Sequence, residues 1–420
     1  MIFITFFIIV LSILSYKKTV LFSAVVLLYM NNLSSGFEGV KLLYLISLVH
    51  IFLFYVMGYY KRRNNKYPRL ILIPTLIASI NYLISSYVGS VHSYTKNIVN
   101  IAAWFFYPYI IWHLMSAKKD VEYYGRILFV FFLIVVGYAL LELLLGQNVY
   151  SRWADEAGII AGELGGLEEG QRFGLLRCNS ILPYCSALGM TCSIVFTALV
   201  ILKRLGKNYF YDKFLIFMLP FCVLLSGTRS QFVVFVMCFL ALFFNKDYRK
   251  TRGLRFLFVV GALGALVFSS VLAEILNSIL YSNSSSAEGS SLGLRLDQFY
   301  ITESYWQQAP WFGHGRSFTW EVAIPESPRL LGAESIVFTQ LIDHGILGLM
   351  SYYIIGICLA VWCYRYSKPL AMLPIAFIVG KTMSTVVGVE YNILIILCIF
   401  VVKAISIGQN SKYEVQHLRN

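Results

Sequence analysis

The stretch ILFVFFLIVVGYALLELLL, residues 127–145, is apolar around nearly the whole circumference of the helix that it predicts. A helix on the surface of a soluble protein keeps a polar stripe, whereas about 20 apolar residues in a row are long enough to cross a bilayer. Residues 181–202 and 346–362 repeat this pattern. Of the 420 residues, 58% are apolar and 13% are charged, against roughly 25% charged residues in soluble domains. The sequence therefore predicts an all-α polytopic membrane protein.

Similar apolar stretches follow one another along the whole chain. They predict about 12 or 13 transmembrane helices in a single domain over residues 1–420. The predicted spans are 2–16, 19–31, 40–59, 69–88, 97–116, 126–146, 180–202, 212–226, 230–245, 254–280, 334–364, 369–387 and 389–407.

Basic residues gather in alternate loops between these spans. Seven such segments hold 24 of the 34 Lys and Arg and only five acidic residues. This positive-inside pattern places those loops and the C-terminal tail in the cytoplasm, with the N-terminus outside. Membrane topology thus explains the net charge of +13, and nucleic-acid binding is not predicted. The eight Cys lie mostly inside spans without a metal-ligand spacing, so no metal site is predicted.

Two loops on the outward side are longer than a turn requires. The smaller covers residues 146–179 and the larger covers residues 281–333. Long loops in a compact fold are usually functional or disordered. Within the larger loop we expect a short amphipathic helix over 294–308 and a turn at 310–313, lying at the membrane surface among interfacial aromatic side chains.

Four charged residues lie near the ends of predicted spans: Glu142, Glu274, Lys381 and Glu390. These positions predict side chains that snorkel to the membrane surface. The span centres carry no series of carboxylates or His, and no internal repeat is visible in the sequence. Both observations disfavour a proton-coupled transporter.

The segment LLSGTRSQFVVF, residues 224–235, predicts a tight helix hairpin with Arg229 at its outward tip. A guanidinium is always charged and offers a planar fork of donors that fits phosphate oxygens. Ser226, Gly227 and Thr228 allow backbone amides to approach an anion at the N-terminus of the second helix. The alternative is an arginine that reaches outer lipid headgroups. An outward arginine runs against the charge pattern of the chain, however, so an anion-binding role is predicted.

Four more arginines lie in the outward loops. Arg295 and Arg316 belong to the aromatic-rich half of the larger loop, and Arg172 and Arg177 to the smaller loop. Together with Arg229 they suit a lipid-linked phosphate or pyrophosphate at the membrane surface. Salt bridges inside the loops are the alternative, because both loops also contain acidic residues.

Glu334 and Ser335 open the predicted span 334–364. The helix dipole stabilises a carboxylate at a helix start, so Glu334 is either a helix-start residue or a general base at the membrane surface. His314, in the larger loop, is a candidate for substrate binding because its imidazole can titrate near neutral pH. A lone His is more often a packing residue, and this alternative stays open.

Two groups of residues together resemble the family of O-antigen polymerases and ligases, bacterial membrane enzymes that handle undecaprenyl-pyrophosphate-linked glycans. The first, SGTRSQ at 226–231, is similar to the Ser-x-Ser-Arg hairpin of that family. The second is PWFGHGRS at 310–317 followed by ESIVFTQLIDHGILGL at 334–349, which looks like the family's Pro-x-Phe-Gly-x-Gly element and its helix ending in Gly-Ile-Leu-Gly. The resemblance covers roughly residues 220–350. Ligase-like members carry His where this chain has Glu334, and this departure favours a polymerase.

The resemblance implies a glycosyltransferase that joins undecaprenyl-pyrophosphate-linked oligosaccharide repeat units at the periplasmic face of the bacterial inner membrane, during lipopolysaccharide O-antigen biosynthesis. In such an enzyme Arg229 and Arg295 would neutralise the pyrophosphate leaving group, and Glu334 would be the catalytic base. Residues implied to bind pyrophosphate or glycan are Arg316, His314, Arg172 and Arg177.

The resemblance implies no cofactor and no metal. The partners that it implies are the lipid-linked glycan donor and acceptor, membrane lipids and a chain-length regulator protein. Two alternative functions are an O-antigen ligase that transfers polysaccharide to lipid A-core, and a flippase or transporter of lipid-linked oligosaccharides.

Overall fold

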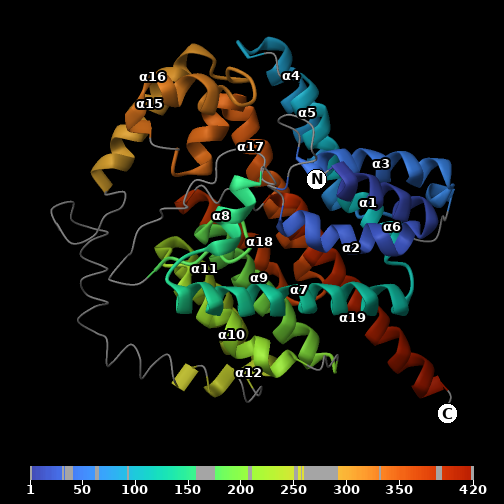
Figure 1. The fold of residues 1–420 in the computed structure, drawn as a ribbon. Coiled ribbons are helices and arrows are strands. Elements are labelled where there is room, and N and C mark those ends of the chain that lie inside the picture. Colours follow the sequence, from blue (N-terminus) through green and yellow to red (C-terminus); the bar gives the residue numbers. More distant parts are fainter. Residues whose placement is uncertain are drawn as a thin grey trace.

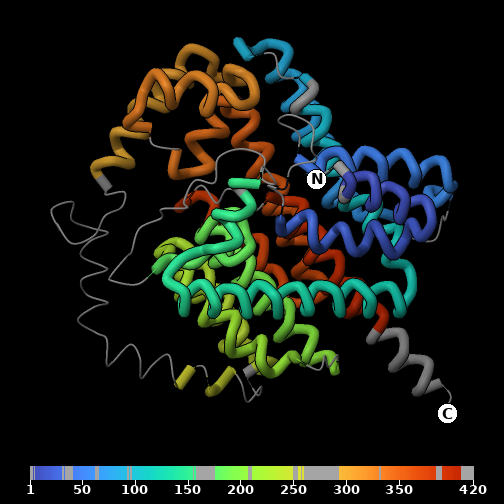
Figure 2. The backbone as a smooth tube through the Cα atoms, in the orientation of Figure 1, coloured from blue at the N-terminus to red at the C-terminus, as the bar shows by residue number. Residues whose placement is uncertain are grey.

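The computed structural model describes residues 2–30, 33, 41–61, 66–91, 94–157, 176–206, 211–249, 254–256, 258–259, 292–330, 333–384 and 390–417. Within these residues every regular element is a helix, and Figure 1 shows most of them packed into one bundle. Figure 2 follows the same path as a backbone tube. The predicted all-α membrane fold is confirmed.

The first part of the chain forms α1 (Ile2–Leu14), α2 (Tyr16–Tyr29), α3 (Leu42–Val56), η1 (Tyr59–Lys61), α4 (Arg69–Val88), α5 (Tyr94–Ile101), the π-helical η2 (Ala102–Phe106), α6 (Tyr107–Leu114), α7 (Lys118–Leu145) and α8 (Val149–Glu156). The second part forms α9 (Cys185–Arg204), α10 (Asp212–Leu225), α11 (Arg229–Phe244), α12 (Lys246–Arg249), α15 (Leu292–Gln308), the π-helical η3 (Thr319–Ala323), α16 (Ile324–Glu326), η4 (Pro328–Leu330), α17 (Ile336–Tyr364), α18 (Lys368–Met383) and α19 (Tyr391–His417).

Helix α9 lies at the centre of the bundle. It is almost entirely buried and contacts α10, α11, α18 and α19. Its small side chains, such as Ala187 and Ser193, let neighbouring helices approach closely, which is how helices associate in lipid. A Cβ on Gly189 would lie 2.6 Å from Cβ of Gln231 and 2.7 Å from the Ser226 hydroxyl. The hairpin between α10 and α11 is therefore seated directly on α9.

Among the described residues, α4, α7, α9 and α17 are long and apolar enough to cross a membrane. Shorter apolar helices lie at Thr5–Leu14, Leu42–Val56, Arg229–Phe244 and Tyr391–Ile407. Large apolar side chains on the outer faces are exposed, for example Ile80 on α4 and Leu144 on α7, as expected of helices that face lipid. The total of 12 or 13 spans stays a prediction, because the predicted span 254–280 lies mostly outside the described residues.

Some predicted spans differ from the observed helices. Helix α9 begins at Cys185 instead of 180, because residues 176–184 follow an irregular path. The predicted span 97–116 contains the π-helical segment η2 between α5 and α6. The predicted span 334–364 corresponds to α17, which is kinked at Gly345, where φ is 64° and ψ is −167°.

The described part of the larger outward loop, 292–330, is folded. Helix α15 confirms the helix predicted over 294–308, and a turn follows it at 309–313 as predicted. The prediction that this helix is amphipathic was wrong, because its apolar and polar side chains are not separated onto two faces. Figure 1 shows α15 and α16 beside one end of α17. A small apolar core joins them to α17, consisting of Phe318, Ala323, Leu330, Ala333, Phe338 and Ile342. The loop is therefore anchored on the helix that begins just after Glu334.

Candidate functional site

Helices α10 and α11 form the tight hairpin that the SGTR sequence predicts. Helix α10 ends at Leu225 and α11 begins at Arg229. Gly227 has φ of 60°, a left-handed conformation that glycine adopts at no steric cost. The Ser226 hydroxyl donates to the Val223 carbonyl at 2.7 Å and lies 2.7 Å from the Thr228 hydroxyl. This turn places Arg229 at the first residue of α11, as predicted.

Arg177 lies against the same turn. A Cβ on Gly227 would lie 2.8 Å from Cγ of Arg177. Next to Arg177, the Cys178 N–H donates to the Leu225 carbonyl at 2.9 Å. Glycine at 227 therefore makes room for the arginine side chain, and backbone pairing holds the arginine segment beside the hairpin.

Glu142, on α7, holds the residues that follow Arg177. Its carboxylate accepts hydrogen bonds from the N–H of Asn179 at 3.3 Å and from the N–H of Ser180 at 2.7 Å. Glu142 is only 2% exposed, so the prediction that it snorkels to the membrane surface was wrong. It is instead a buried acceptor that fixes the irregular segment carrying Arg177.

Arg295 approaches the hairpin from α15. Its Nη2 atom donates to the Met383 carbonyl at 2.9 Å and lies 4.0 Å from a carboxylate oxygen of Glu334. The charged groups that act on the Arg229 guanidinium are Arg295, Arg177 and Glu334. We call Arg177, Arg229, Arg295 and Glu334 the arginine cluster. Three arginines from separate segments thus converge beside one carboxylate.

Ser335, and not Glu334, caps α17. The Ser335 hydroxyl accepts from the Val337 N–H at 3.2 Å and donates to the Thr382 carbonyl at 2.7 Å. Glu334 precedes this cap, and its side chain is 36% exposed. The helix-start role therefore belongs to Ser335, and the Glu334 carboxylate lies among the arginines.

The segment PWFGHGRS lies along the kink of α17, backbone against backbone. The N–H groups of His314 and Gly315 donate to the carbonyls of Ile342 and Asp343 at 2.9 and 3.0 Å. The N–H of Ile346, just after the kink, donates back to the segment at 2.9 Å. These bonds satisfy backbone groups that an unbroken helix would pair internally.

Glycine is required on both sides of this contact. A Cβ on Gly345 would lie 2.5 Å from the carbonyl carbon of Trp311, and a Cβ on Gly313 would lie 2.5 Å from that of Asp343. Both glycines also have positive φ, 64° and 68°. The glycines of the two sequence motifs therefore allow the outward loop to dock on α17.

Gly345→Ala is expected to lower the free energy of unfolding by roughly 2–5 kcal/mol, because it adds a backbone clash to a strained conformation. Thermal unfolding of the detergent-purified protein measures this. Gly137→Ala on α7 is the matched control, since a Cβ there has no atom within 4 Å, and a helix-interior Gly→Ala change is neutral or mildly stabilising. An unchanged midpoint for Gly345→Ala would contradict the close docking of the loop.

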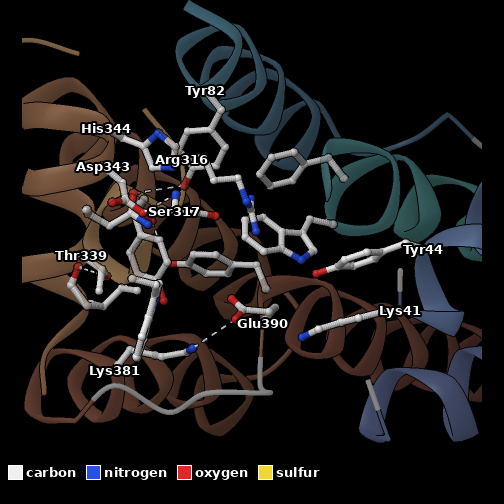
Figure 3. A pocket seen from close by; sticks show the side chains of 17 residues that line it. Lys41, Tyr44, Tyr82, Arg316, Ser317, Thr339, Asp343, His344, Lys381 and Glu390 are labelled. Carbon is white, nitrogen blue, oxygen red and sulfur yellow. Dashed lines mark hydrogen bonds and ion pairs between the residues drawn. The ribbon is translucent and has the colours of Figure 1, made fainter. Parts of the chain in front are cut away.

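A cavity of about 230 Å³ lies beside α17 (Figure 3). Its walls come from α4, α17, α18, the π-helical η2, the segment 316–320 at the start of η3, and the residues at the starts of α3 and α19. Charged side chains that line it are Lys41, Arg316, Asp343, Lys381 and Glu390. This cavity combines both signs of charge with aromatic side chains.

Arg316 lines this cavity and is not among the residues of the arginine cluster. Its guanidinium lies 4.7 Å from the centre of the Trp104 ring. The Asp343 carboxylate accepts from the N–H of Ser317 at 3.1 Å, from the N–H of Thr319 at 2.8 Å and from the Thr319 hydroxyl at 2.6 Å. Asp343 thereby fixes the turn that follows Arg316, and Arg316 lines the cavity whereas Arg295, from the same loop, does not.

His314 does not join the arginine cluster. Its Nε2 atom lies 2.8 Å from the Tyr305 carbonyl oxygen, and its ring stacks on Phe318 with centres 4.3 Å apart. The structure thus gives His314 a packing role between α15 and the loop. Arg172 lies outside the described residues.

Lys381 and Glu390 form an ion pair in the cavity wall, with Nζ and Oε1 3.7 Å apart. Lys381 is 1% exposed, so the prediction that it snorkels to the membrane surface was wrong. The sequence did hold a signal for the pair, because the two charges flank the predicted junction between spans 369–387 and 389–407. Side chains of opposite charge on either side of a short loop between two helices can form an ion pair.

Residues 214–353 match the model of a family described as O-antigen ligase. The match covers about a third of the chain and contains Arg229, Arg295, Arg316 and Glu334. No curated protein matches the chain. The resemblance of this region to the O-antigen polymerase and ligase family is confirmed. Members of that family are glycosyltransferase-like membrane enzymes. The match does not separate polymerases from ligases.

Proposed function

We propose that the chain, with a region of the O-antigen ligase family at residues 214–353, is an O-antigen polymerase. It would join undecaprenyl-pyrophosphate-linked repeat units at the periplasmic face of the bacterial inner membrane. The observation that carries the proposal is the arginine cluster, in which three guanidiniums meet one carboxylate beside a helix N-terminus.

The charge of the cluster suits a lipid-linked pyrophosphate. The formal charges of Arg177, Arg229, Arg295 and Glu334 add up to +2, and a pyrophosphate diester carries two negative charges. Guanidinium forks bind phosphate oxygens through paired hydrogen bonds. Fixed donors placed where charge develops lower the barrier to departure of the leaving group. The cluster would therefore hold the carrier pyrophosphate and stabilise it as it leaves.

Glu334 is the proposed base. An acceptor hydroxyl attacks the anomeric carbon of the donor sugar and forms a new C–O bond, while the bond from that carbon to the pyrophosphate breaks. The hydroxyl proton passes to the Glu334 carboxylate, and the bonding electrons leave with undecaprenyl pyrophosphate. Arg295 lies 4.0 Å from Glu334. Binding of the pyrophosphate would draw Arg295 toward phosphate and free the carboxylate to accept the proton.

A ligase is the second candidate, because the matched family carries that description. Purified protein supplied only with lipid-linked repeat units distinguishes the two functions. A polymerase is expected to elongate them into a ladder of products, since donor and acceptor are then the same molecule. A ligase would leave them unchanged until lipid A-core is added, and that result would overturn the polymerase proposal.

A flippase or transporter of lipid-linked oligosaccharides is the alternative function that is not catalytic. Such a protein would use the arginine cluster for binding alone and would make no covalent bond. Growth of covalent product in detergent, where no membrane separates two compartments, excludes it. Binding of the lipid-linked unit without any product under these conditions would support it.

A further inference from the structure

The cavity beside α17 has no role in the reaction step proposed above. Figure 3 shows Lys41 and Tyr44 pointing into it from the side of α3, with Arg316 above and Glu390 below. Its volume of about 230 Å³ is below the roughly 300–1,000 Å³ of pockets that bury drug-sized molecules. A single sugar ring is a ligand of suitable size.

The charged side chains of the cavity wall are directed at one another. Arg316 interacts electrostatically with the Asp343 carboxylate, which also accepts three hydrogen bonds from the turn after Arg316. Glu390 lies 3.7 Å from the Lys381 ammonium, and Figure 3 shows the Lys41 side chain extending toward Glu390. A charged ligand would have to compete with these pairs after losing its own hydration, which costs free energy. The cavity therefore favours an uncharged ligand.

The cavity wall also carries uncharged polar groups that make no hydrogen bond within the described part of the chain. Two of them are the hydroxyl of Tyr44 and the side-chain amide nitrogen of Gln340. The Gln340 oxygen accepts from the Tyr82 hydroxyl at 3.3 Å, which fixes the amide and leaves its N–H groups for a ligand. A hydroxyl both donates and accepts, whereas an amide nitrogen only donates.

The imidazole of His344 supplies an acceptor. The Ser85 hydroxyl donates its proton to the Asp343 carbonyl at 2.7 Å, so its oxygen can only accept from Nδ1 of His344, which lies 3.0 Å away. Nδ1 therefore carries the proton, and Nε2 of the neutral ring is left as a hydrogen-bond acceptor. Because His344 lines the cavity, this acceptor is available to a ligand there.

This combination of groups fits the hydroxyls and the ring of a sugar. Each sugar hydroxyl donates and accepts, and the wall offers both kinds of partner. Aromatic side chains that line the cavity include Tyr44, Trp320 and Tyr391, and an apolar ring face packs against the C–H face of a pyranose. A lipid acyl chain in the same place would leave the polar groups without hydrogen bonds, which is unfavourable.

Helices α17 and α18 bring the cavity close to the arginine cluster. On α17, Ile336 lines the cavity and follows Glu334 by two positions, at most about 7 Å between Cα atoms. On α18, Lys381 lines the cavity, and two positions later the Met383 carbonyl accepts from Arg295 at 2.9 Å. A glycan whose reacting hydroxyl lies at Glu334 can therefore place an adjoining sugar in the cavity.

We propose that this cavity is a subsite for an uncharged pyranose, which hydrogen-bonds to Tyr44, Gln340 and His344. The proposal rests on the proposed function only for the statement that the sugar is part of the acceptor glycan, next to the reacting hydroxyl. The recognition itself requires no turnover, and it is tested as binding of a single sugar.

The experiment uses the full chain, purified in a detergent whose headgroup is not a sugar, with saturation-transfer NMR titrations to measure binding. The uncharged probes are the methyl glycosides of glucose, galactose, mannose and N-acetylglucosamine. The charged probes are methyl glucuronide, with a carboxylate, and methyl glucosaminide, with an ammonium. At least one uncharged probe is expected to bind about tenfold more tightly than both charged probes, because a charge loses hydration in the cavity without gaining a free partner.

Variants of the wall identify the groups that bind the sugar. Tyr44→Phe and Gln340→Met are each expected to weaken binding of the preferred probe by roughly 2- to 10-fold, the effect of one hydrogen bond. Tyr44→Ala, which also removes the ring, should weaken it further. The matched control is Tyr87→Phe, because Tyr87 lies on α4, is 73% exposed and does not line the cavity. It should bind the probe as wild type does.

The proposal has three contrary outcomes. They are binding of no uncharged probe, equal or tighter binding of a charged probe, and unchanged binding by Tyr44→Phe. Should Gln340→Met not elute as folded protein, Tyr44→Phe carries the test, since the Tyr44 hydroxyl makes no hydrogen bond among the described residues whose loss could unfold the chain.

Failure of the polymerase proposal is read out separately. Arg229→Ala is expected to lose product growth and to keep sugar binding, because Arg229 does not line the cavity. Loss of polymerisation with intact sugar binding thus concerns the arginine cluster. Wild-type product growth without binding of any uncharged probe would overturn the sugar subsite alone.

Discussion

Replacing Arg229 with Ala is expected to lower the rate of polymerisation by on the order of 10²–10³-fold, which corresponds to the loss of one preorganised donor from an anionic transition state. The side chain lies at the start of α11 among Arg177, Arg295 and Glu334. Its removal leaves the hairpin bonds of Ser226 intact. The protein should therefore still fold and insert.

Two measurements check this result. In a purified assay the products should stay near single repeat units, and in cells the lipopolysaccharide should carry single, unpolymerised repeats. Arg329→Ala is the matched control, because Arg329 is an exposed arginine outside the arginine cluster, and it should give the wild-type ladder. Arg229→Lys should fall between the two, since an ammonium keeps the charge but loses the planar fork. Normal ladders with Arg229→Ala would remove Arg229 from the mechanism.

The hairpin and the outward helix were predictable from local sequence. Apolar stretches on both sides of SGT leave room only for a short turn, so Arg229 had to lie at a hairpin tip. Residues 294–308 have the composition of an interfacial helix, and α15 occupies them. The distribution of Lys and Arg predicts the outward side for Arg295, and this side stays a prediction.

The place of Arg177 could not be predicted in this way. It depends on a buried carboxylate of α7, Glu142, which holds Asn179 and Ser180, and on the backbone pair between Cys178 and Leu225. These contacts join segments that are distant in sequence. A charge near a span end predicts snorkelling, and only the fold shows that Glu142 faces inward.

The sequence also could not predict that Arg295 and Arg316 lie at two different sites. Both lie in one outward loop, and sequence alone assigned them to one phosphate site. The loop reverses at Gly313 and Gly315, where it docks on the kink of α17, and Asp343 then orients the turn after Arg316. The glycines signal a close backbone approach, but the segment approached is known only from the structure.

Replacing Glu334 with Gln is expected to reduce turnover by about 10²–10⁴-fold, the contribution of a positioned general base. Gln has nearly the same size and cannot accept the proton of the acceptor hydroxyl. The fold should be unaffected, because Ser335 caps α17 and Arg295 keeps its hydrogen bond to Met383. Binding of a labelled lipid-linked repeat unit should therefore persist while product formation is lost.

The kinetic pattern decides between a base and a residue that only orients Arg295. A lost base lowers kcat and leaves KM nearly unchanged, whereas a misplaced Arg295 weakens pyrophosphate binding and raises KM. Glu303→Gln is the control, since Glu303 lies on α15, outside the arginine cluster, and accepts a hydrogen bond from Gln307.

Because Arg295 lies within 4.0 Å of Glu334, a double variant that combines Glu334→Gln with Arg295→Ala adds a second criterion. If Glu334 acts only through Arg295, removing both residues should be no worse than removing Arg295 alone; if Glu334 takes the proton, the double variant should be slower than either single one.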